Sequence, residues 1–232
     1  MIEDRVAAVR QRIARAAERA SRLPEEVTLV AVSKTWPAEA VRAAFAAGVR
    51  HFGENRVQEA DAKIAVLTEL RAGGLRWHLV GHLQSNKARK AAALFDMIQS
   101  VHSVELAERL ARAGAELGRT LRVLVQVDLA GEAGKSGLAE SAVEGALRRM
   151  RDLDGLRVEG LMVLPPYLDD PEEVRPYFAR LRGLRDRVVA AGLLDGTELS
   201  MGMSHDFETA VEEGATIVRV GTAIFGERTA AA

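Results

Sequence analysis

Eight short apolar segments, separated by segments with helical spacing, constrain the fold more than any other feature of the sequence. The segments with strand character cover residues 27–35, 49–55, 76–81, 95–101, 121–128, 156–164, 197–201 and 216–220. The helical segments between them cover residues 37–47, 57–70, 85–93, 104–117, 138–150, 172–191 and 207–213. Repeated strand-then-helix units predict parallel strands joined by right-handed crossovers.

Eight parallel strands in 232 residues favour a closed (β/α)₈ TIM barrel, an α/β fold that we expect to form a single domain over residues 1–232. Apolar residues at three- and four-residue spacing predict an extra N-terminal helix over residues 6–20. The alternative is an open, doubly wound sheet. Gly53, Gly73-Gly74 and Gly81 do not form the G-x-G-x-x-G turn that would favour it.

The segment at residues 27–35 is rich in valine, lacks polar alternation and delivers Lys34 at its end. A strand of this kind is typical of a parallel sheet covered on both faces. The chain has 32 lysines and arginines, of which only five are lysines. A lysine kept in such a chain suggests a role that arginine cannot fill, that of a neutral nucleophilic amine. A snorkelling or ion-paired lysine is the equally weighted alternative.

In a closed barrel the carboxyl ends of the strands meet at one mouth, where ligands bind. The residues that we expect there are Lys34, Asn55, His82 or Gln84, His102, Gln126 or Asp128, Met162, Ser200, and Arg219 with Gly221-Thr222. The Gly221-Thr222 turn offers successive backbone N–H groups and a hydroxyl, which suit a phosphate, and Ser200 offers another hydroxyl. An amine beside a phosphate site predicts a phosphorylated carbonyl ligand.

Two chemistries begin with a Schiff base between a lysine amine and such a ligand. One is permanent capture of pyridoxal phosphate, and the other is transient capture of a sugar phosphate by a class I aldolase. A guanidinium at Arg219 facing a pyridine nitrogen would keep that nitrogen unprotonated and weaken the cofactor as an electron sink. Considered alone, Arg219 is more typical of a strand-end ion pair.

Several classes of function are disfavoured by composition. The chain has no cysteine, which excludes disulfides and thiolate catalysis, and its net charge of -1 gives no reason to expect nucleic acid or a membrane as partner. No apolar run approaches the ~20 residues of a membrane span, and no secretion signal is evident, so we expect a cytoplasmic protein. His78 and His82 are four apart but on a strand, so we expect no metal site.

Five motifs closely resemble the YggS/PROSC family, the pyridoxal phosphate homeostasis proteins. They are VSKT at 32–35, HFGEN at 51–55, WHLVGHLQSNK at 77–87, SMGMSHDF at 200–207 and RVGTAIFG at 219–226. The resemblance implies a barrel like the N-terminal domain of alanine racemase, with Lys34 as the internal aldimine of pyridoxal 5'-phosphate. It also implies Ser200, Gly221 and Thr222 around the phosphate, Asn55 near the ring and Arg219 near the pyridine nitrogen.

Met201, which follows Ser200, completes the set of candidate cofactor-binding residues, with packing as its alternative role. The sequence departs from the family at Arg56, where a tyrosine is common, and at Asp128, where an asparagine is usual. The roles of these two positions are therefore open.

The resemblance implies a non-catalytic carrier that buffers or delivers the cofactor, with pyridoxal phosphate-requiring apo-enzymes as recipients. We expect a monomer and no catalytic residue. A racemase-like amino-acid enzyme and a class I aldolase are the alternatives. Racemases that resemble this barrel take a second base from an added β domain and a partner subunit, and we expect no such domain here. A third class, an interaction module built on the barrel, would need a docking surface.

Overall fold

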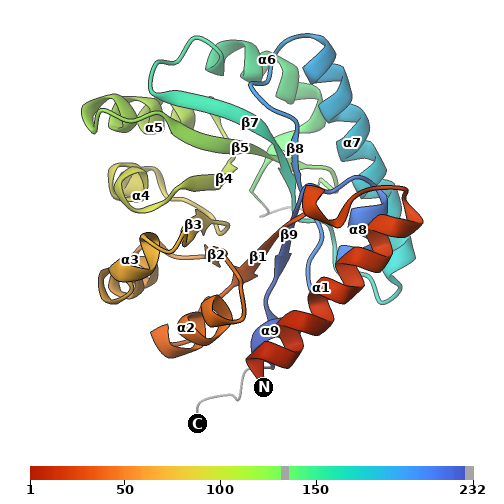
Figure 1. Ribbon diagram of the computed structural model, residues 1–232. Coiled ribbons are helices and arrows are strands. Elements are labelled where there is room, and N and C mark those ends of the chain that lie inside the picture. The colour runs from red at the N-terminus through yellow and green to blue at the C-terminus, as the bar shows by residue number, and fades with distance from the viewer. Residues whose placement is uncertain (132–135, 228–232) are drawn as a thin grey trace.

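The strands of the computed structural model form one sheet in which every pairing is parallel, and the pairing of β4 with β5 closes it into a barrel (Figure 1). The structure describes residues 1–131 and 136–227. The eight barrel strands are β1 (Thr28–Val32), β2 (His51–Glu54), β3 (Arg76–Leu79), β4 (Met97–Val101), β5 (Leu121–Asp128), β7 (Leu156–Val163), β8 (Glu198–Ser200) and β9 (Ile217–Val220). The prediction of a (β/α)₈ barrel is confirmed.

Helices surround the barrel on its outer side (Figure 1). The α-helices are α1 (Ile2–Arg19), α2 (Ala38–Ala46), α3 (Val57–Val66), α4 (Ala88–Leu94), α5 (Val104–Glu116), α6 (Glu140–Met150), α7 (Arg175–Ala190), α8 (Phe207–Glu212) and α9 (Thr222–Phe225). Short 3₁₀ helices are η1 (Pro24–Glu26), η2 (Thr68–Arg71), η3 (Ser85–Lys87) and η4 (Pro171–Val174). Within the described ranges, no helix combines the length and apolar character needed to cross a membrane.

One strand and one α-helix have no counterpart in the predicted set. The strand β6 (Leu138–Ala139) pairs with the end of β5, and α9 follows β9 directly. Both are too short for a period of two or 3.6 residues to be visible in a sequence. The glycine-rich loop before α6 lies partly outside the described residues, and the assignment of residues 1–232 to a single domain stays a prediction.

The N-terminal helix α1 is present as predicted and packs beside α2, α8 and α9 (Figure 1). One face of α1 is buried in the main apolar core through Val6, Val9 and Ile13. Residues of α8 belong to the same core, and beside it Arg12 of α1 meets Glu208 of α8 at 2.7 Å. The last helix, α9, has only four residues, so it can cover little of the apolar outer surface of the barrel. The apolar face of α1 covers part of that surface in its place.

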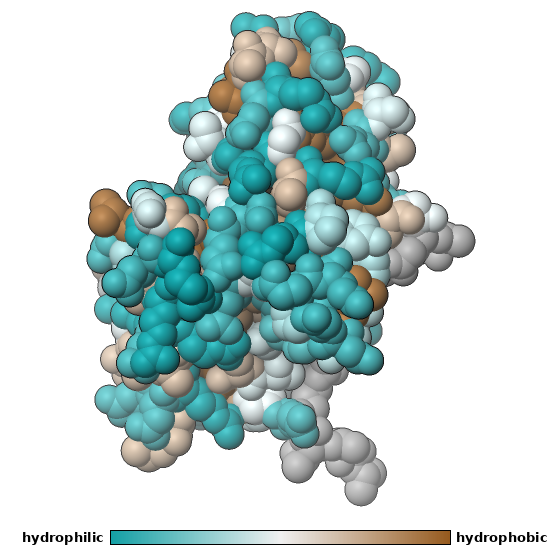
Figure 2. All heavy atoms as spheres, turned by 90° about the vertical axis from the view of Figure 1, so that its right-hand side faces the viewer, coloured by the Kyte–Doolittle hydropathy of each residue, from teal (hydrophilic) through white to brown (hydrophobic). Residues whose placement is uncertain are grey.

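The side formed by α1, α7 and α8 is mainly hydrophilic (Figure 2). Ion pairs account for much of this surface: Arg175 contacts Glu172, Glu212 and Glu213 at 2.7 to 3.0 Å. Arg175, Glu212 and Glu213 are half-buried, so their charges are paired with one another at the edge of the solvent.

Strand residues alternate between the outer core and the barrel interior, as the two-residue period of a strand requires. The outward set joins the helices in one large apolar core. A small separate cluster fills the interior: Val30, Met97, Leu124, Met162 and Ile217. Buried polar side chains share the interior with this cluster, among them His78, Gln99, Ser200 and Arg219. Arg219 therefore lies inside the barrel, below the Gly221 turn at the mouth.

Candidate functional site

Lys34 lies in a turn just after β1, at the carboxyl end of the barrel. Its side chain is half-buried, while the preceding Ser33 is fully buried. The turn is closed by the N–H of Trp36, which donates to the Ser33 carbonyl at 3.0 Å. Thr35 adopts a φ of 67°, a left-handed conformation that a β-branched residue rarely adopts. Such a turn needs support from its surroundings.

Lys63, from α3, supplies that support. Its ammonium donates to the Ser33 carbonyl at 2.6 Å and to Glu54 Oε1 at 2.6 Å. The Ser33 hydroxyl donates to the same Glu54 oxygen at 2.6 Å. On the other side, Glu59 accepts from Lys63 at 3.1 Å and from the Thr35 N–H. The backbone on both sides of Lys34 is thus held by one cluster of charged side chains.

Glu54 is fully buried at the end of β2. Burial raises the pKa of its carboxyl group, and the charge and hydrogen bond of Lys63 oppose that rise. Its second oxygen, Oε2, has no hydrogen-bond partner among the described residues. Lys63 is therefore the main compensation for a buried carboxylate, which is costly to leave unpaired.

The Gly221-Thr222 turn lies at the same edge of the sheet as Lys34. Val30 pairs with Arg219 in the β1–β9 register, so two residues further along each strand Val32 neighbours Gly221. The N–H groups of Gly221 and Ala223 both donate to the Ser204 hydroxyl oxygen, at 3.1 and 3.3 Å. Thr222 is exposed. Two backbone donors thus converge on one oxygen atom at the mouth, and the binding of a phosphate by this turn stays a prediction.

Arg219 is almost completely buried, with 3% of its surface exposed. Its guanidinium donates to the Ser200 hydroxyl at 2.5 Å and to the Val163 carbonyl at 2.8 Å. Burial lowers the pKa of Arg219 to about 10, and Asp206 partly opposes this shift. No carboxylate of the described residues lies within ion-pair distance of it. The strand-end ion pair is therefore not found.

Ser200 and Met201, both predicted to bind the cofactor, are fully buried. The Ser200 hydroxyl donates to Gln99 Oε1 at 2.6 Å and accepts from Arg219, so both of its hydrogen-bonding roles are used inside the barrel. The Met201 side chain is fully buried in the outer apolar core. Contacts of either side chain with a ligand stay predictions.

Asn55 is half-buried at the end of β2 and lines a cavity of about 380 Å³ together with Arg56, Gly81 and Lys87. Gly81 allows the two loops to meet, because a Cβ at this position would lie only 2.6 Å from the Asn55 Cα. Arg56, which departs from the family pattern, is exposed at the rim of this cavity. The structure therefore brings Asn55 to the mouth.

His82 and His102 also meet at the mouth, with ring centroids 4.6 Å apart. His82 lines a cavity of about 190 Å³ with Gln126, Asp128 and others. Asp128 accepts hydrogen bonds from the N–H groups of Ala130 and Gly131, at 3.1 and 2.9 Å, so it shapes the loop after β5. These contacts assign a local structural role to a position that the sequence left open.

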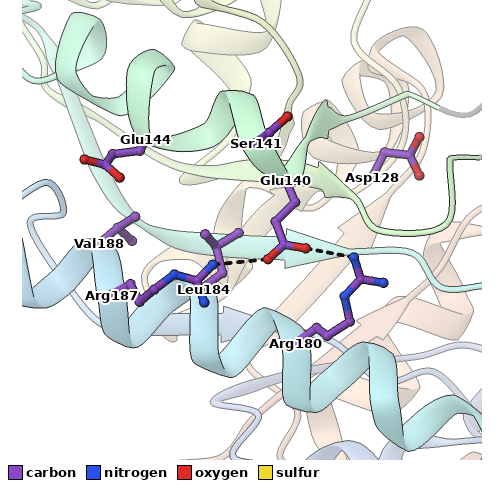
Figure 3. A pocket seen from close by; sticks show the side chains of 8 residues that line it. All are labelled: Asp128, Glu140, Ser141, Glu144, Arg180, Leu184, Arg187 and Val188. Atoms are coloured by element: carbon purple, nitrogen blue, oxygen red, sulfur yellow. Dashed lines mark hydrogen bonds and ion pairs between the residues drawn. The ribbon is translucent and has the colours of Figure 1, made fainter.

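A third cavity, of about 530 Å³, lies outside the barrel between α6 and α7 and is also lined by Asp128 (Figure 3). Glu140 of α6 bridges Arg180 and Arg187 of α7, at 2.8 and 3.1 Å (Figure 3). The charges in this groove are therefore largely paired with one another.

Within the described part of the chain, no three histidine or acidic side chains are grouped as metal ligands would be. His78 lies inside the barrel, 3% exposed, whereas His82 lies exposed at the mouth. These two side chains therefore do not form a pair of ligands.

Three residues of the site have no place in the candidate set: Glu54, Lys63 and Ser204. Lysine is scarce in this chain, and this observation, which drew attention to Lys34, could equally have drawn attention to Lys63. Ser204 lies inside a quoted motif, two residues after a glycine, where a hydroxyl is a reasonable anion ligand. Glu54 is an acidic residue ending a buried strand, a position where an acid requires a partner.

Comparison with known proteins gives a consistent result. The family model of the alanine racemase N-terminal domain matches residues 5–229. The pyridoxal phosphate homeostasis protein of Pseudomonas aeruginosa is 45% identical, over 98% of this chain and 96% of its own length. The structure of PipY of Synechococcus elongatus with pyridoxal phosphate bound is 47% identical, with a TM-score of 0.85, covering 97% of this chain and all of that one.

Alanine racemases share the fold at a greater distance. The enzyme of Corynebacterium glutamicum is 21% identical with a TM-score of 0.70, and the match covers 97% of this chain but 62% of the enzyme. At this identity the likeness concerns the barrel alone.

Proposed function

We propose that this chain, which belongs to the family of pyridoxal phosphate homeostasis proteins, binds pyridoxal 5'-phosphate at the mouth of its barrel and buffers or delivers it to apo-enzymes that require it. In this proposal the protein is a cytoplasmic, monomeric carrier that turns over no substrate. Lys34 holds the cofactor covalently.

One observation supports the proposal: groups suited to three parts of this cofactor lie on or just after the neighbouring strands β1 and β9, two of them at the mouth and one buried below it. The Lys34 amine suits the aldehyde, and the convergent N–H groups of Gly221 and Ala223 suit the phosphate. The buried Arg219, which has no carboxylate partner in the described structure, suits an unprotonated pyridine nitrogen. The residues present therefore fit pyridoxal phosphate.

When bound, pyridoxal phosphate supplies an aldehyde carbon with which the Lys34 nitrogen forms a Schiff base, releasing one water molecule. The chain's own residues contribute orientation. Lys63 and Glu59 fix the turn from which Lys34 projects, and Ser204 holds the two phosphate-type donors in place. Arg219 presents a fixed donor rather than an acid–base pair, which favours holding a cofactor over using it as an electron sink.

The first experiment distinguishes a carrier from an enzyme. We expect purified protein incubated with pyridoxal phosphate to gain absorbance in the visible range, and borohydride to fix the cofactor to the peptide that contains Lys34. Loaded protein should restore activity to a pyridoxal phosphate-dependent apo-enzyme and should not racemise or transaminate amino acids. Steady racemisation would favour the racemase-like alternative, and trapping of a sugar phosphate by colourless protein would favour the aldolase.

The phosphate assignment predicts a selective effect of Thr222→Val. This change keeps the shape of the side chain but removes its hydroxyl, so binding of pyridoxal phosphate should weaken about tenfold, as a hydrogen bond to a charged group is worth about 1.5–3 kcal/mol. Binding of pyridoxal, which lacks the phosphate, should be unchanged. Both dissociation constants are measurable by absorbance titration. An equal loss for both ligands would show that Thr222 acts elsewhere.

A further inference from the structure

Five buried or half-buried side chains form a continuous series of hydrogen bonds through the barrel interior, which we call the interior network. Arg219 Nη1 contacts Ser200 Oγ at 2.5 Å, and Ser200 Oγ contacts Gln99 Oε1 at 2.6 Å. Gln99 Nε2 lies 2.9 Å from His78 Nδ1, and His78 Nε2 lies 2.9 Å from His51 Nδ1. The members come from five different strands: β9, β8, β4, β3 and β2.

The interior network has a single direction, because arginine can only donate. The Ser200 oxygen accepts from Arg219, so its own hydrogen points to Gln99. Gln99 then presents its oxygen to Ser200 and its NH₂ to His78. His78 must accept at Nδ1 and carry its hydrogen on Nε2, from which it donates to His51. The direction of every hydrogen bond in the series is therefore set by Arg219, which can only donate.

The two end members of the network flank β1 at one register position, because Val30 pairs with Arg219 on β9 and with His51 on β2. Arg219 is one strand residue away from the Gly221 turn at the mouth, and His51 is the first residue of β2. Burial lowers the pKa of His51, Arg122 and Arg76 lower it further, and Asp96 opposes them. Burial also places the pKa of His78 well below its ordinary value. Both shifts favour the neutral ring, the form that the direction of the network requires.

We propose that Gln99 and His78 are positioning residues for the cofactor site, which hold the Ser200 hydroxyl and, through it, the Arg219 guanidinium in one orientation. This inference rests on the proposed function, since Arg219 is the group assigned to the pyridine nitrogen. Neither Gln99 nor His78 belongs to the mouth, and both are buried. They act on the ligand through the hydrogen bonds that join His78 to Gln99, Gln99 to Ser200 and Ser200 to Arg219. Each of these bonds holds the next side chain in one orientation.

The positioning role is tested with Gln99→Met, which keeps the length of the side chain and removes both amide contacts. Met97→Leu is the matched control, because Met97 is a buried interior residue on the same strand, two residues earlier. We expect Gln99→Met to raise the dissociation constant of pyridoxal phosphate about tenfold, by analogy with the low end of the effect of residues that orient metal ligands, and to shift the absorbance maximum of the bound cofactor. Met97→Leu should leave both unchanged.

The outcomes separate this inference from the proposed function. Normal binding by the unmodified protein with no difference between the two variants would overturn the positioning role alone. Failure of the unmodified protein to bind pyridoxal phosphate would overturn the proposed function and the positioning role together.

A second measurement reads the network directly and needs no cofactor. In the ¹⁵N spectrum of histidine-labelled protein at neutral pH, we expect His78 as the neutral tautomer with its hydrogen on Nε2. In Gln99→Glu the new carboxylate accepts from both neighbours, so His78 should gain a hydrogen on Nδ1. A hydrogen on Nδ1 of His78 in the unmodified protein would contradict the deduced direction and overturn the inference.

Discussion

Replacing Lys34 with alanine is expected to abolish covalent capture of pyridoxal phosphate and to weaken its retention by at least about 100-fold, equivalent to about 2.8 kcal/mol. The reason is that the amine is the group assigned to the aldehyde, whereas the groups around it can contribute only non-covalent contacts. Absorbance titration and mass spectrometry after borohydride treatment measure the two effects. Unfolding in urea should show an intact fold, because the side chain is half-buried at the mouth and not part of the core.

Lys34→Arg is the matched control for charge. Arginine keeps a positive charge at the same place but has no amine that can lose its proton and attack an aldehyde. We expect it to fail in covalent capture as alanine does, while retaining more of the non-covalent affinity. Capture by either variant would mean that another of the chain's lysines is the attachment site, which peptide mapping would identify.

Lys63→Met is expected to lower the free energy of unfolding by about 3–5 kcal/mol, the usual cost of breaking a buried ion pair on one side. The methionine fills similar space but leaves the carboxylate of Glu54, which is fully buried, without its cation. It also removes the donor to the Ser33 carbonyl, so the turn of Lys34 should loosen and covalent capture should slow. Urea unfolding and the rate of absorbance change measure these two consequences.

The cost of Lys63→Met should depend on pH. Burial raises the pKa of Glu54 above its ordinary value of 4.5, and Lys63 holds that rise in check. Without Lys63 the folded-state pKa rises further, so stability is present at low pH and is lost as pH increases from 4.5 through that raised value. The variant should therefore be destabilised more at about pH 8 than at about pH 4.5.

Two further variants test the explanation. Lys90→Met breaks an exposed ion pair with Asp61 and should cost at most about 1 kcal/mol. Combining Glu54→Gln with Lys63→Met removes the buried charge itself and should restore part of the stability lost in the single variant. A loss of equal size in Lys63→Met and Lys90→Met would contradict the buried ion pair as the source of the effect.

The sequence predicted the order of strands and helices well because both depend on local patterns. The strand before Lys34 was visible as a continuous apolar run, and α5 and α6 were visible as helical segments of more than ten residues. The prediction was less accurate where a helix begins with a 3₁₀ turn, as at η3 and η4, since both helix types have similar spacing over one turn. The two-residue β6 and the four-residue α9 were too short to show any period.

The candidate site was predicted as positions on strands rather than as contacts. Lys34, Asn55, Arg219 and Gly221 could be placed at one end of the barrel because parallel strands bring their carboxyl ends to the same edge. The sequence did not predict which partner each side chain would contact. It did not show that the Ser200 hydroxyl hydrogen-bonds to Gln99 and Arg219, or that the hydroxyl beside the Gly221 turn belongs to Ser204, and contact of Ser200 with a phosphate stays a prediction.

The sequence by itself therefore determined the barrel and identified Lys34 as its most informative residue, since repeated strand-then-helix units and a rare amine are both legible along the chain. Only the tertiary structure decided how Lys34 and Arg219 are held. Lys63 reaches the Ser33 carbonyl across 30 residues, and Ser200 reaches Gln99 across 101. The physical reason is that burial makes each polar group dependent on a partner, and closure of the barrel selects that partner from distant strands.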